Sequence, residues 1–402
     1  PVSAVLAGIL EKAGVFGIIK VINGMFGYDT NLGSTVIGFG LVTMLLGASF
    51  ALFQDNVKRV LAYSSISQIG FIITGIGAAV YLGEAGGLAF AGAMFHILNH
   101  ALFKVLLFLA IGSIYFRTHE LSLQRLGGFG KKMPLVFGAF IVGFAGISGM
   151  PLFNGYISKT LLHEALLEAY SFTGDELFRV AERIFIITSA LTVCYILKIT
   201  VKVFLDKPAE DLYVSGEPES TPLMTGSLWV LAIMVAVIGI FPGVVWNNLI
   251  LPAVSGYYPV THHMSSIHLM EAAPVFTAAG IIGLGLLIYV LCRHTGLIES
   301  TAASVPDAVG IVIRRPVFRK AGSIYSKIIN IVNTGFDDAI NRGLQAAAKL
   351  YYRYGLMEPA AGEPEKSCGQ KPAYIDITGT GKKYISGGEV RPAYVSSGLI
   401  TL

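Results

Sequence analysis

The sequence predicts an all-α protein that folds as a polytopic transmembrane helix bundle. Of its 402 residues, 54% are hydrophobic and only 13% are charged, and the mean hydropathy is +0.67. A soluble domain carries about 25% charged residues, so this composition excludes an ordinary cytosolic enzyme, and the high apolar content excludes a disordered chain. The net charge of +4 is small and spread along the chain, which gives no indication of nucleic-acid binding.

Several apolar segments are long enough to cross a bilayer, which takes about 20 apolar residues in a helix. The segment 86–116 is long for one straight span, so we expect it to be tilted or interrupted near His96–His100. Roughly eight spans are predicted in total, at about 2–22, 34–54, 60–82, 86–116, 135–170, 181–205, 223–249 and 274–292.

The segment 135–170 predicts a discontinuous helix near 150–155. As one helix it would extend about 54 Å, against a hydrocarbon core of about 30 Å. Pro151, Asn154 and Gly155 stand in its middle, and proline and glycine both weaken a helix. We therefore predict two half-helices joined by an unwound segment, an arrangement that often marks an ion site. An ordinary proline kink is the alternative.

Basic residues concentrate in alternate loops, which include Lys58, Arg125, Lys207 and Arg293. By the positive-inside rule these loops face the cytoplasm, and the C-terminus should lie on that side as well. Residues 305–355 mix apolar and basic positions and predict an amphipathic or additional helix. Residues 356–402 are polar and predict a cytoplasmic tail.

An ionisable side chain at the centre of a bilayer costs about 2.5–3.5 kcal/mol, so such groups usually serve a function. Lys12 lies in the middle of the first predicted span. Glu11 precedes it, but neighbouring residues on a helix point about 100° apart, so we do not expect the two to form a pair. The alternative for Lys12 is snorkelling of its ammonium to an interface, which we also expect for Lys198 and Lys202.

His96, His100 and Lys104 are spaced four residues apart, which places them on one face of a helix. Histidine titrates near neutral pH, and a buried lysine can lose and regain its proton. The stripe is therefore a candidate proton relay. Structural histidines are one alternative. A metal site is another, but it lacks a carboxylate, and a lysine one turn away would repel the cation.

Lys159 follows the predicted helix break. Glu11, His163 and Glu164 are possible accessory groups of the relay. A lysine beside an unwound segment is a place for a proton to pause, and a lysine at the membrane edge is the alternative. We find no phosphate-binding loop, dinucleotide motif or metalloprotease motif. The cysteines, Cys194, Cys292 and Cys368, are widely separated. The sequence therefore predicts neither a cofactor site nor a metal site in this chain.

Four segments in order resemble one family. They are PVSA at 1–4 with EKAGV at 11–15, RVLAYSSISQIG at 59–70, FHILNHALFKVLLFL at 95–109, and GMPLFNGYISK at 149–159. The family is that of the antiporter-like membrane subunits of respiratory complex I, membrane-bound hydrogenases and multisubunit cation/proton antiporters.

The resemblance implies that residues 1–293 form an antiporter-like domain. It would contain the last helix of a first repeat, a complete second five-helix repeat and two or so further helices. Lys12 would match the central connecting lysine of the family. Lys104 with its two histidines would match the lysine stripe of the second half-channel, and Lys159 the terminal residue on the second broken helix. The first repeat, with its glutamate–lysine pair, is missing here, so a further segment or a second polypeptide is expected to supply it.

By the same resemblance, the expected function is proton translocation as a membrane subunit of a redox-driven complex. The alternative is a subunit of a multisubunit Na⁺/H⁺ antiporter without a redox module, and a weaker one is a non-translocating scaffold. Sodium prefers oxygen ligands, and the spans contain few acidic groups, which favours protons.

No redox catalytic site is expected in this chain. Iron–sulfur clusters, flavin or a NiFe centre would belong to partner subunits. The expected partners are sister antiporter-like subunits, other membrane subunits, peripheral redox subunits and the lipid of a prokaryotic inner membrane, with no nucleic acid.

Overall fold

The computed structural model describes residues 2–212, 221–260 and 272–295. Within these ranges the chain is helical and forms no β-strand, and its one isolated bridge joins Asn56 to Ser122. The predicted all-α bundle is therefore confirmed. The segments predicted at 305–355 and 356–402 lie outside the described residues.

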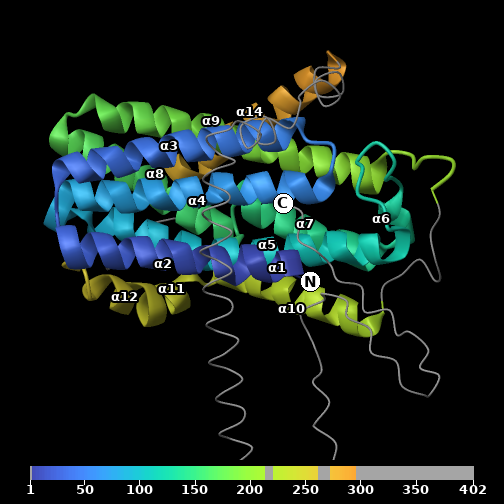
Figure 1. The fold of residues 1–402 in the computed structure, drawn as a ribbon, viewed down its shortest axis with the longest axis horizontal. Helices are drawn as coiled ribbons and strands as arrows, with labels where there is room; N and C mark the ends of the chain where they lie inside the picture. The colour runs from blue at the N-terminus through green and yellow to red at the C-terminus, as the bar shows by residue number, and fades with distance from the viewer. Residues whose placement is uncertain (1, 213–220, 261–271, 296–402) are drawn as a thin grey trace, which may run out of the picture. The chain divides into compact units, whose positions relative to one another are not determined.

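Several spans are single uninterrupted helices, among them α3 (Thr30–Phe53), α4 (Val57–Leu82), α5 (Gly87–Thr118) and α14 (Ala272–His294). Helices α3, α4 and α5 follow one another with short connections (Figure 1). The first span joins α1 (Val2–Val5), a π-helical turn (Leu6–Leu10), α2 (Glu11–Val21) and a second π-helical turn (Ile22–Phe26). The remaining elements are α6 (Phe129–Lys132), α7 (Pro134–Ser148), α8 (Asn154–Thr173), α9 (Glu176–Ile199) with its π-helical extension (Thr200–Leu205), α10 (Pro222–Ile240), α11 (Pro242–Val245), a π-helical turn (Trp246–Ile250) and α12 (Leu251–Ser255).

Six helical stretches among the described residues are long and apolar enough to cross a membrane. One of them, Val57–Thr118, contains both α4 and α5, which a short 3₁₀ turn at Gly83–Gly86 connects. These spans make the chain an integral membrane protein that crosses the bilayer several times.

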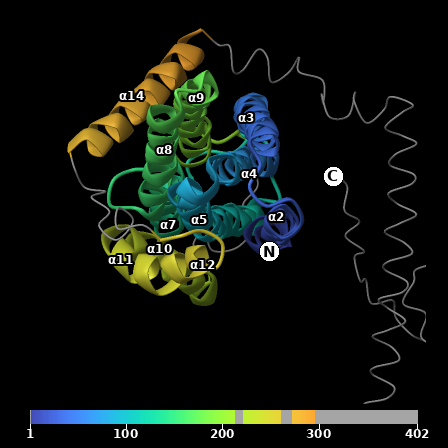
Figure 2. The same cartoon turned by 90° about the vertical axis from the view of Figure 1, so that its left-hand side faces the viewer.

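Helix α5 occupies the middle of the bundle, between α4, α7 and α8 (Figure 2). It runs without interruption from Gly87 to Thr118, so the alternative of a break near His96–His100 is wrong. The physical reason is that no glycine or proline stands between Ala93 and Ile111. At 1.5 Å per residue the helix is about 48 Å long, and its central position buries the polar stripe that it carries.

The break near 150–155 is confirmed. Helix α7 ends at Ser148 and α8 begins at Asn154. Between them Gly149 has φ +75° and Leu152 has φ +72°, which an α-helix cannot contain. The Asn99 amide on α5 donates to the backbone carbonyl of Asn154 at 2.6 Å. A neighbouring helix thus satisfies part of the freed backbone, as a break inside a membrane requires.

The predicted span 223–249 is wrong at its end. Helix α10 stops at Ile240, and the chain continues into the short helices α11 and α12, which lie beside α10 (Figure 2). Pro242 explains the stop, because the residue before a proline is disfavoured in the helical region, and Phe241 has φ −119° and ψ 57°.

Basic segments from four parts of the chain meet at the end of the bundle that carries α6 (Figure 1). The Val57 N–H donates to Leu121 at 2.9 Å, and the Ala209 N–H donates to Arg125 at 3.0 Å. Arg293 of α14 reaches Asp206 at 3.3 Å. The prediction that the basic residues lie in alternate loops, at one end of the bundle, is therefore confirmed for these loops. The side of the membrane that they face stays a prediction.

Candidate functional site

The polar stripe of α5 lies buried against α4 and α8. The His96 ring lies 2.8 Å from the Ser158 hydroxyl through Nδ1 and 3.1 Å from Gln68 Oε1 through Nε2. Its ring is nearly parallel to that of His100, at 5° and a centroid distance of 6.3 Å. With both nitrogens of His96 engaged by neutral side chains, this arrangement suits hydrogen bonding and proton exchange and leaves no nitrogen free for a metal.

Lys104 is 0% exposed. Its ammonium donates to the Leu61 carbonyl at 2.9 Å and to the Ser64 hydroxyl, both on α4. Gln68, also on α4, donates to the Thr192 hydroxyl on α9 at 3.5 Å. The Tyr195 hydroxyl of α9 is buried and has no hydrogen-bond partner among the described residues. Hydroxyl and amide groups of α4 and α9 therefore lie between Lys104 and His96.

His100 lies between these two groups along α5. Both of its ring nitrogens are buried, and neither has a hydrogen-bond partner among the described side chains and backbone. Buried polar groups are normally satisfied by protein or by ordered water. The position of His100 therefore suits a water-linked step within the stripe.

Lys12 and Glu11 form a pair, contrary to the expectation from helix geometry. The Lys12 ammonium lies 3.8 Å from Glu11 Oε2 and also donates to the Ala7 carbonyl. The long lysine side chain bends back over the π-helical turn Leu6–Leu10, which the 100° rule for a regular α-helix does not describe. Lys12 interacts electrostatically with His96 and His100, and Glu11 interacts with Lys104, which places this pair beside the stripe.

Lys159 lies at the break between the two half-helices. Its ammonium donates to the Ile147 carbonyl at 2.8 Å, at the C-terminus of α7, and lies 5.4 Å from the centre of the Phe71 ring. The negative end of the α7 dipole favours a cation there. The side chain is buried, so the alternative of a lysine at the membrane edge does not describe it. Ser158, the residue before it, connects this site to His96.

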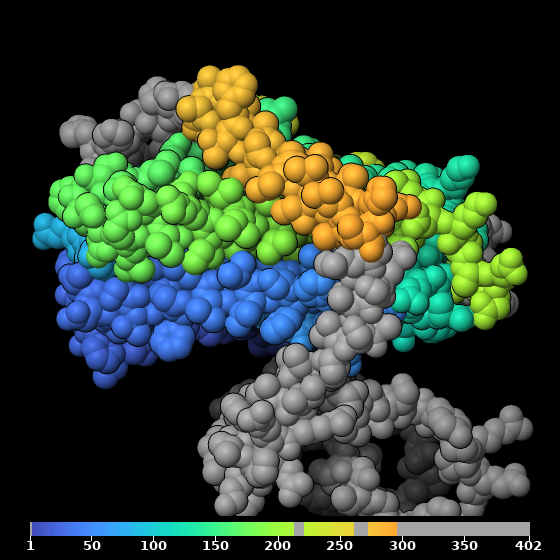
Figure 3. Space-filling view, turned by 90° about the horizontal axis from the view of Figure 1, so that it is seen from above, coloured from blue at the N-terminus to red at the C-terminus, as the bar shows by residue number. Residues whose placement is uncertain are grey.

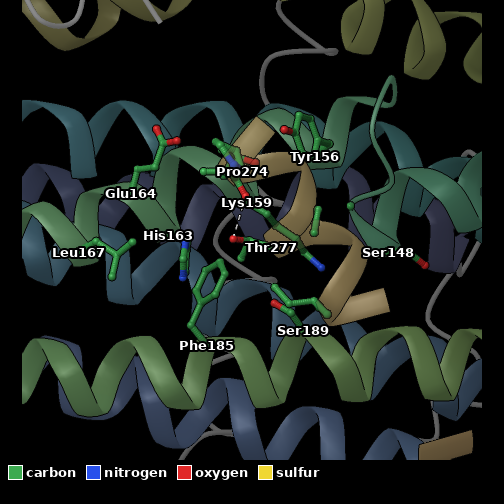
Figure 4. A pocket seen from close by; sticks show the side chains of 15 residues that line it. Ser148, Tyr156, Lys159, His163, Glu164, Leu167, Phe185, Ser189, Pro274 and Thr277 are labelled. Carbon is green, nitrogen blue, oxygen red and sulfur yellow. Dashed lines mark hydrogen bonds between the residues drawn. The ribbon is translucent and has the colours of Figure 1, made fainter. Parts of the chain in front are cut away.

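The predicted accessory groups His163 and Glu164 differ in their surroundings. His163 lies 3.1 Å from the Glu182 carboxylate on α9. Glu164, like His163 and Lys159, lines a cavity beside the helix break, but its carboxylate points away from the Lys159 ammonium (Figure 4). Within the described ranges there is no group of three or more His, Cys, Asp or Glu side chains that could hold a metal ion.

Lys198 does not snorkel, so that expectation is wrong. It is buried, and its ammonium donates to the Leu52 and Gln54 carbonyls at 2.9 and 2.6 Å, at the C-terminus of α3. Lys202 forms an ion pair with Asp206 at 3.5 Å. Lys198 thus joins α9 to the end of α3, and Lys202 pairs within its own segment.

Sequence reasoning missed several groups that the structure brings to the site. They are Ser64, Gln68, Ser158, Glu182 and Tyr195. Ser64 and Gln68 stand four residues apart in an apolar span, and that spacing was a usable signal. Tyr195 and Glu182 had none, because they come from a helix far along the chain and meet α4 and α8 only through folding.

Comparisons with known proteins agree with this architecture. Residues 1–184 match the family described as NADH:quinone oxidoreductase/Mrp antiporter, TM. The chain is 31% identical over 314 residues to an Na⁺/H⁺ antiporter subunit of Alkalihalophilus pseudofirmus, covering 73% of this chain and 39% of that protein. It is 37% identical over 174 residues to hydrogenase-4 component B of Escherichia coli K12, covering 41% of this chain and 26% of that protein.

Among solved structures, the fold resembles a chain of the Mrp complex from Dietzia sp. DQ12-45-1b. The TM-score is 0.57 and the identity 23%, over 65% of this chain and 54% of that one. The chain thus spans about two fifths of the antiporter protein of Alkalihalophilus pseudofirmus and about a quarter of the hydrogenase component. Residues 1–184, a little under half of this chain, are therefore similar to the NADH:quinone oxidoreductase/Mrp antiporter transmembrane family.

Proposed function

We propose that this chain is a proton-translocating membrane subunit of a redox-driven complex, and that protons move along Lys12, His96, His100, Lys104 and Lys159. The observation that carries the proposal is the complete burial of Lys104 and His96 in the central helix. Polar groups from α4, α8 and α9 surround them and lead to the helix break. Groups this costly inside a membrane normally serve transport.

Repulsion between like charges can couple the protonation of one site to the release of a proton from the next. A proton that arrives at Lys12 disfavours a second positive charge at His100 or Lys104, because charges separated from water interact strongly. Loading one site therefore drives a proton from the next one onward. Moving one charge against a membrane potential costs about 2.3 kcal/mol per 100 mV, an amount that a redox reaction in a partner can supply.

The redox chemistry and the remaining transport helices are assigned to partners. Iron–sulfur clusters, flavin or a NiFe centre would sit in peripheral subunits, and sister antiporter-like subunits would lie beside this chain in a prokaryotic inner membrane. The C-terminus would face the cytoplasm. The likeness to hydrogenase-4 component B, at 37% identity, supports a redox complex.

A second function, as part of a multisubunit Na⁺/H⁺ antiporter, has its own supporting observation. The match to the antiporter protein of Alkalihalophilus pseudofirmus extends over 314 residues of alignment, against 174 for the hydrogenase component. A non-translocating scaffold is disfavoured, because a buried stripe of two histidines and a lysine is costly in a membrane and, unlike Lys198, does not cap the end of a helix.

Replacing Lys104 with alanine tests the proposal. In inverted membrane vesicles, Lys104→Ala should abolish proton uptake while electron transfer from the partner to an artificial acceptor largely continues. Lys198→Ala is the matched control, since Lys198 is also a buried lysine, but its ammonium donates to backbone carbonyls at the end of a helix. It should preserve proton uptake per assembled complex. Normal uptake in the Lys104 variant would overturn the relay.

The source of energy is tested by the proteins that co-purify with the chain. Purification from its native membrane in mild detergent, followed by mass spectrometry, should recover iron–sulfur or hydrogenase subunits in a fixed ratio. Recovery of only small membrane subunits and sister antiporter chains, with sodium-dependent proton movement, would favour the antiporter instead.

A further inference from the structure

A cavity of about 260 Å³ opens beside Lys159, between α8, α9 and α14 (Figure 4). Helix α14 lies on the outside of the bundle along α9 (Figure 3) and forms the outer wall with Pro274 and Thr277. Because Lys159 is otherwise buried, this cavity is its route to the surface between these helices.

The inner part of the cavity carries polar groups that lack protein partners. Ser148 and Ser189 are 2% and 1% exposed, and the hydroxyl of each is buried with no hydrogen-bond partner among the described residues. Ser148 belongs to the last turn of α7, and Ser189 to α9. Polar cavities larger than the ~30 Å³ share of one water molecule are normally hydrated, so these hydroxyls suit a short water chain at the ammonium.

The outer part of the cavity carries a pair of proton carriers. His163 lies one helical turn beyond Lys159, and its Nε2 lies 3.1 Å from Glu182 Oε1. The two side chains are 13% and 19% exposed, whereas the whole of Lys159 is 6% exposed. Exposure thus rises from the lysine outward. An imidazole in contact with a carboxylate can accept a proton on one side and release it on the other.

We propose that Lys159 exchanges protons with the exterior of the bundle through this cavity, and that His163 and Glu182 form the transfer pair at its mouth. A proton leaves the Lys159 ammonium, crosses water in the cavity to the His163 imidazole, and passes through the Glu182 carboxylate to solvent. His163 and Glu182 are then back in their starting protonation states, and Lys159 regains its proton from the polar stripe of α5. This inference rests on the proposed function and adds Glu182, which no sequence motif indicated.

Thiol labelling tests whether the cavity is a water route. In a background where Cys194, Cys292 and Cys368 are replaced by alanine, Thr277→Cys should react in intact membranes with a charged methanethiosulfonate reagent. Proton transport should then fall at least tenfold. Phe276→Cys is the matched control, because Phe276 is adjacent but 74% exposed on the apolar outer face, and it should stay unmodified. An unreactive Thr277→Cys, or a modified one that transports normally, would overturn the route.

Substitution of Glu182 tests the transfer pair. Glu182→Gln keeps a hydrogen-bond acceptor for His163 but cannot carry the proton, so transport per assembled complex should fall about tenfold. Glu182→Asp should restore most of it. Glu176→Gln, at the exposed start of the same helix, is the control. If Glu182→Gln transports normally while Lys104→Ala does not, the inference fails and the proposed function stands. If Lys104→Ala also transports normally, the proposed function fails too.

Discussion

Lys104 and Lys198 are both buried lysines, but their contacts give them different roles. The Lys198 ammonium donates to two backbone carbonyls at the end of α3. Lys104 donates to the Leu61 carbonyl and to the Ser64 hydroxyl, and that hydroxyl itself donates to the Leu61 carbonyl at 2.8 Å. Carbonyl groups accept hydrogen bonds but have no proton to relay. Lys198 is therefore a cap, whereas Lys104 belongs to a network.

Lys198→Ala should lower the stability of the protein. The substitution leaves the Leu52 and Gln54 carbonyls without the ammonium that caps them, at a cost of about 1–3 kcal/mol. The apparent melting temperature of the detergent-purified protein measures the effect. Lys131→Ala is the control, since Lys131 is exposed on the short helix α6 at the same end and should melt like the unchanged protein. Equal melting of the two variants would contradict the capping role.

At the scale of the elements, α3 and α4 pack through glycines. A Cβ on Gly70 of α4 would lie 2.4 Å from the Met44 backbone nitrogen, and one on Gly47 of α3 would lie 2.5 Å from the Ser67 backbone nitrogen. Small residues allow membrane helices to approach this closely. The contact holds α4 in place, and α4 supplies Ser64 and Gln68 to the stripe.

Gly70→Ala should therefore separate α3 from α4. The added methyl meets backbone rather than a movable side chain, so we expect a loss of about 1–3 kcal/mol from overpacking. Gly38→Ala is a matched control on α3, because a Cβ there meets nothing within 4 Å. Thermal unfolding in detergent should show a lower melting temperature for the first variant alone. A Gly70 variant as stable as the Gly38 variant would show that the helices can shift to accommodate it.

The break between α7 and α8 depends on the same kind of contact. A Cβ on Gly155 would lie 1.8 Å from the Gly146 carbonyl oxygen, so the start of α8 can pass the end of α7 only because residue 155 is glycine. The crossing brings the Lys159 ammonium onto the Ile147 carbonyl. The position of the candidate terminal lysine is thus a consequence of how the broken helix packs.

At the scale of the molecule, the loop after α5 organises the end of the bundle where the basic loops meet. The Glu120 carboxylate accepts hydrogen bonds from the Ser122 and Leu121 N–H groups at 2.9 and 2.8 Å, and from Arg125 at 2.6 Å. The backbone N–H groups of Ser122 and Leu121, together with the Arg125 guanidinium, hold the pKa of Glu120 below its usual value, against a partial opposing effect of burial. The Arg125 guanidinium also donates a hydrogen bond to the Asp211 carboxylate at 2.9 Å.

A carboxylate with a lowered pKa stabilises the fold at pH values above its unfolded pKa, and this stabilisation is lost as the pH falls through its folded pKa. Glu120→Gln should therefore melt at a lower temperature than the unchanged protein at pH 7. The difference should shrink as the pH falls below the usual carboxyl range. Melting curves in detergent across that range measure it. A difference that persists unchanged at acidic pH would show that the charge of Glu120 does not contribute.

The sequence predicted the spans best where apolar runs ended at clear signals. The break at Pro151–Gly155 was predicted because Pro, Asn and Gly interrupt one long run. The end of α10 was missed, although Pro242 marks it, because the residues beyond it stay apolar and hydropathy does not distinguish a continuing span from short helices. The pair between Glu11 and Lys12 was missed because the 100° rule assumes a regular α-helix, and a π-helical turn precedes them.

The sequence by itself determined that the chain spans a membrane, that α5 carries two histidines and a lysine on one face, and that a lysine follows a helix break. These features depend on spacing within one segment, which the periodicity of a helix converts directly into geometry. Only the tertiary structure decided that Gln68 and Ser158 hold His96, that Lys198 caps α3, and that Glu182 meets His163. Those contacts join residues on different helices, and helix packing, which local periodicity does not specify, brings them together.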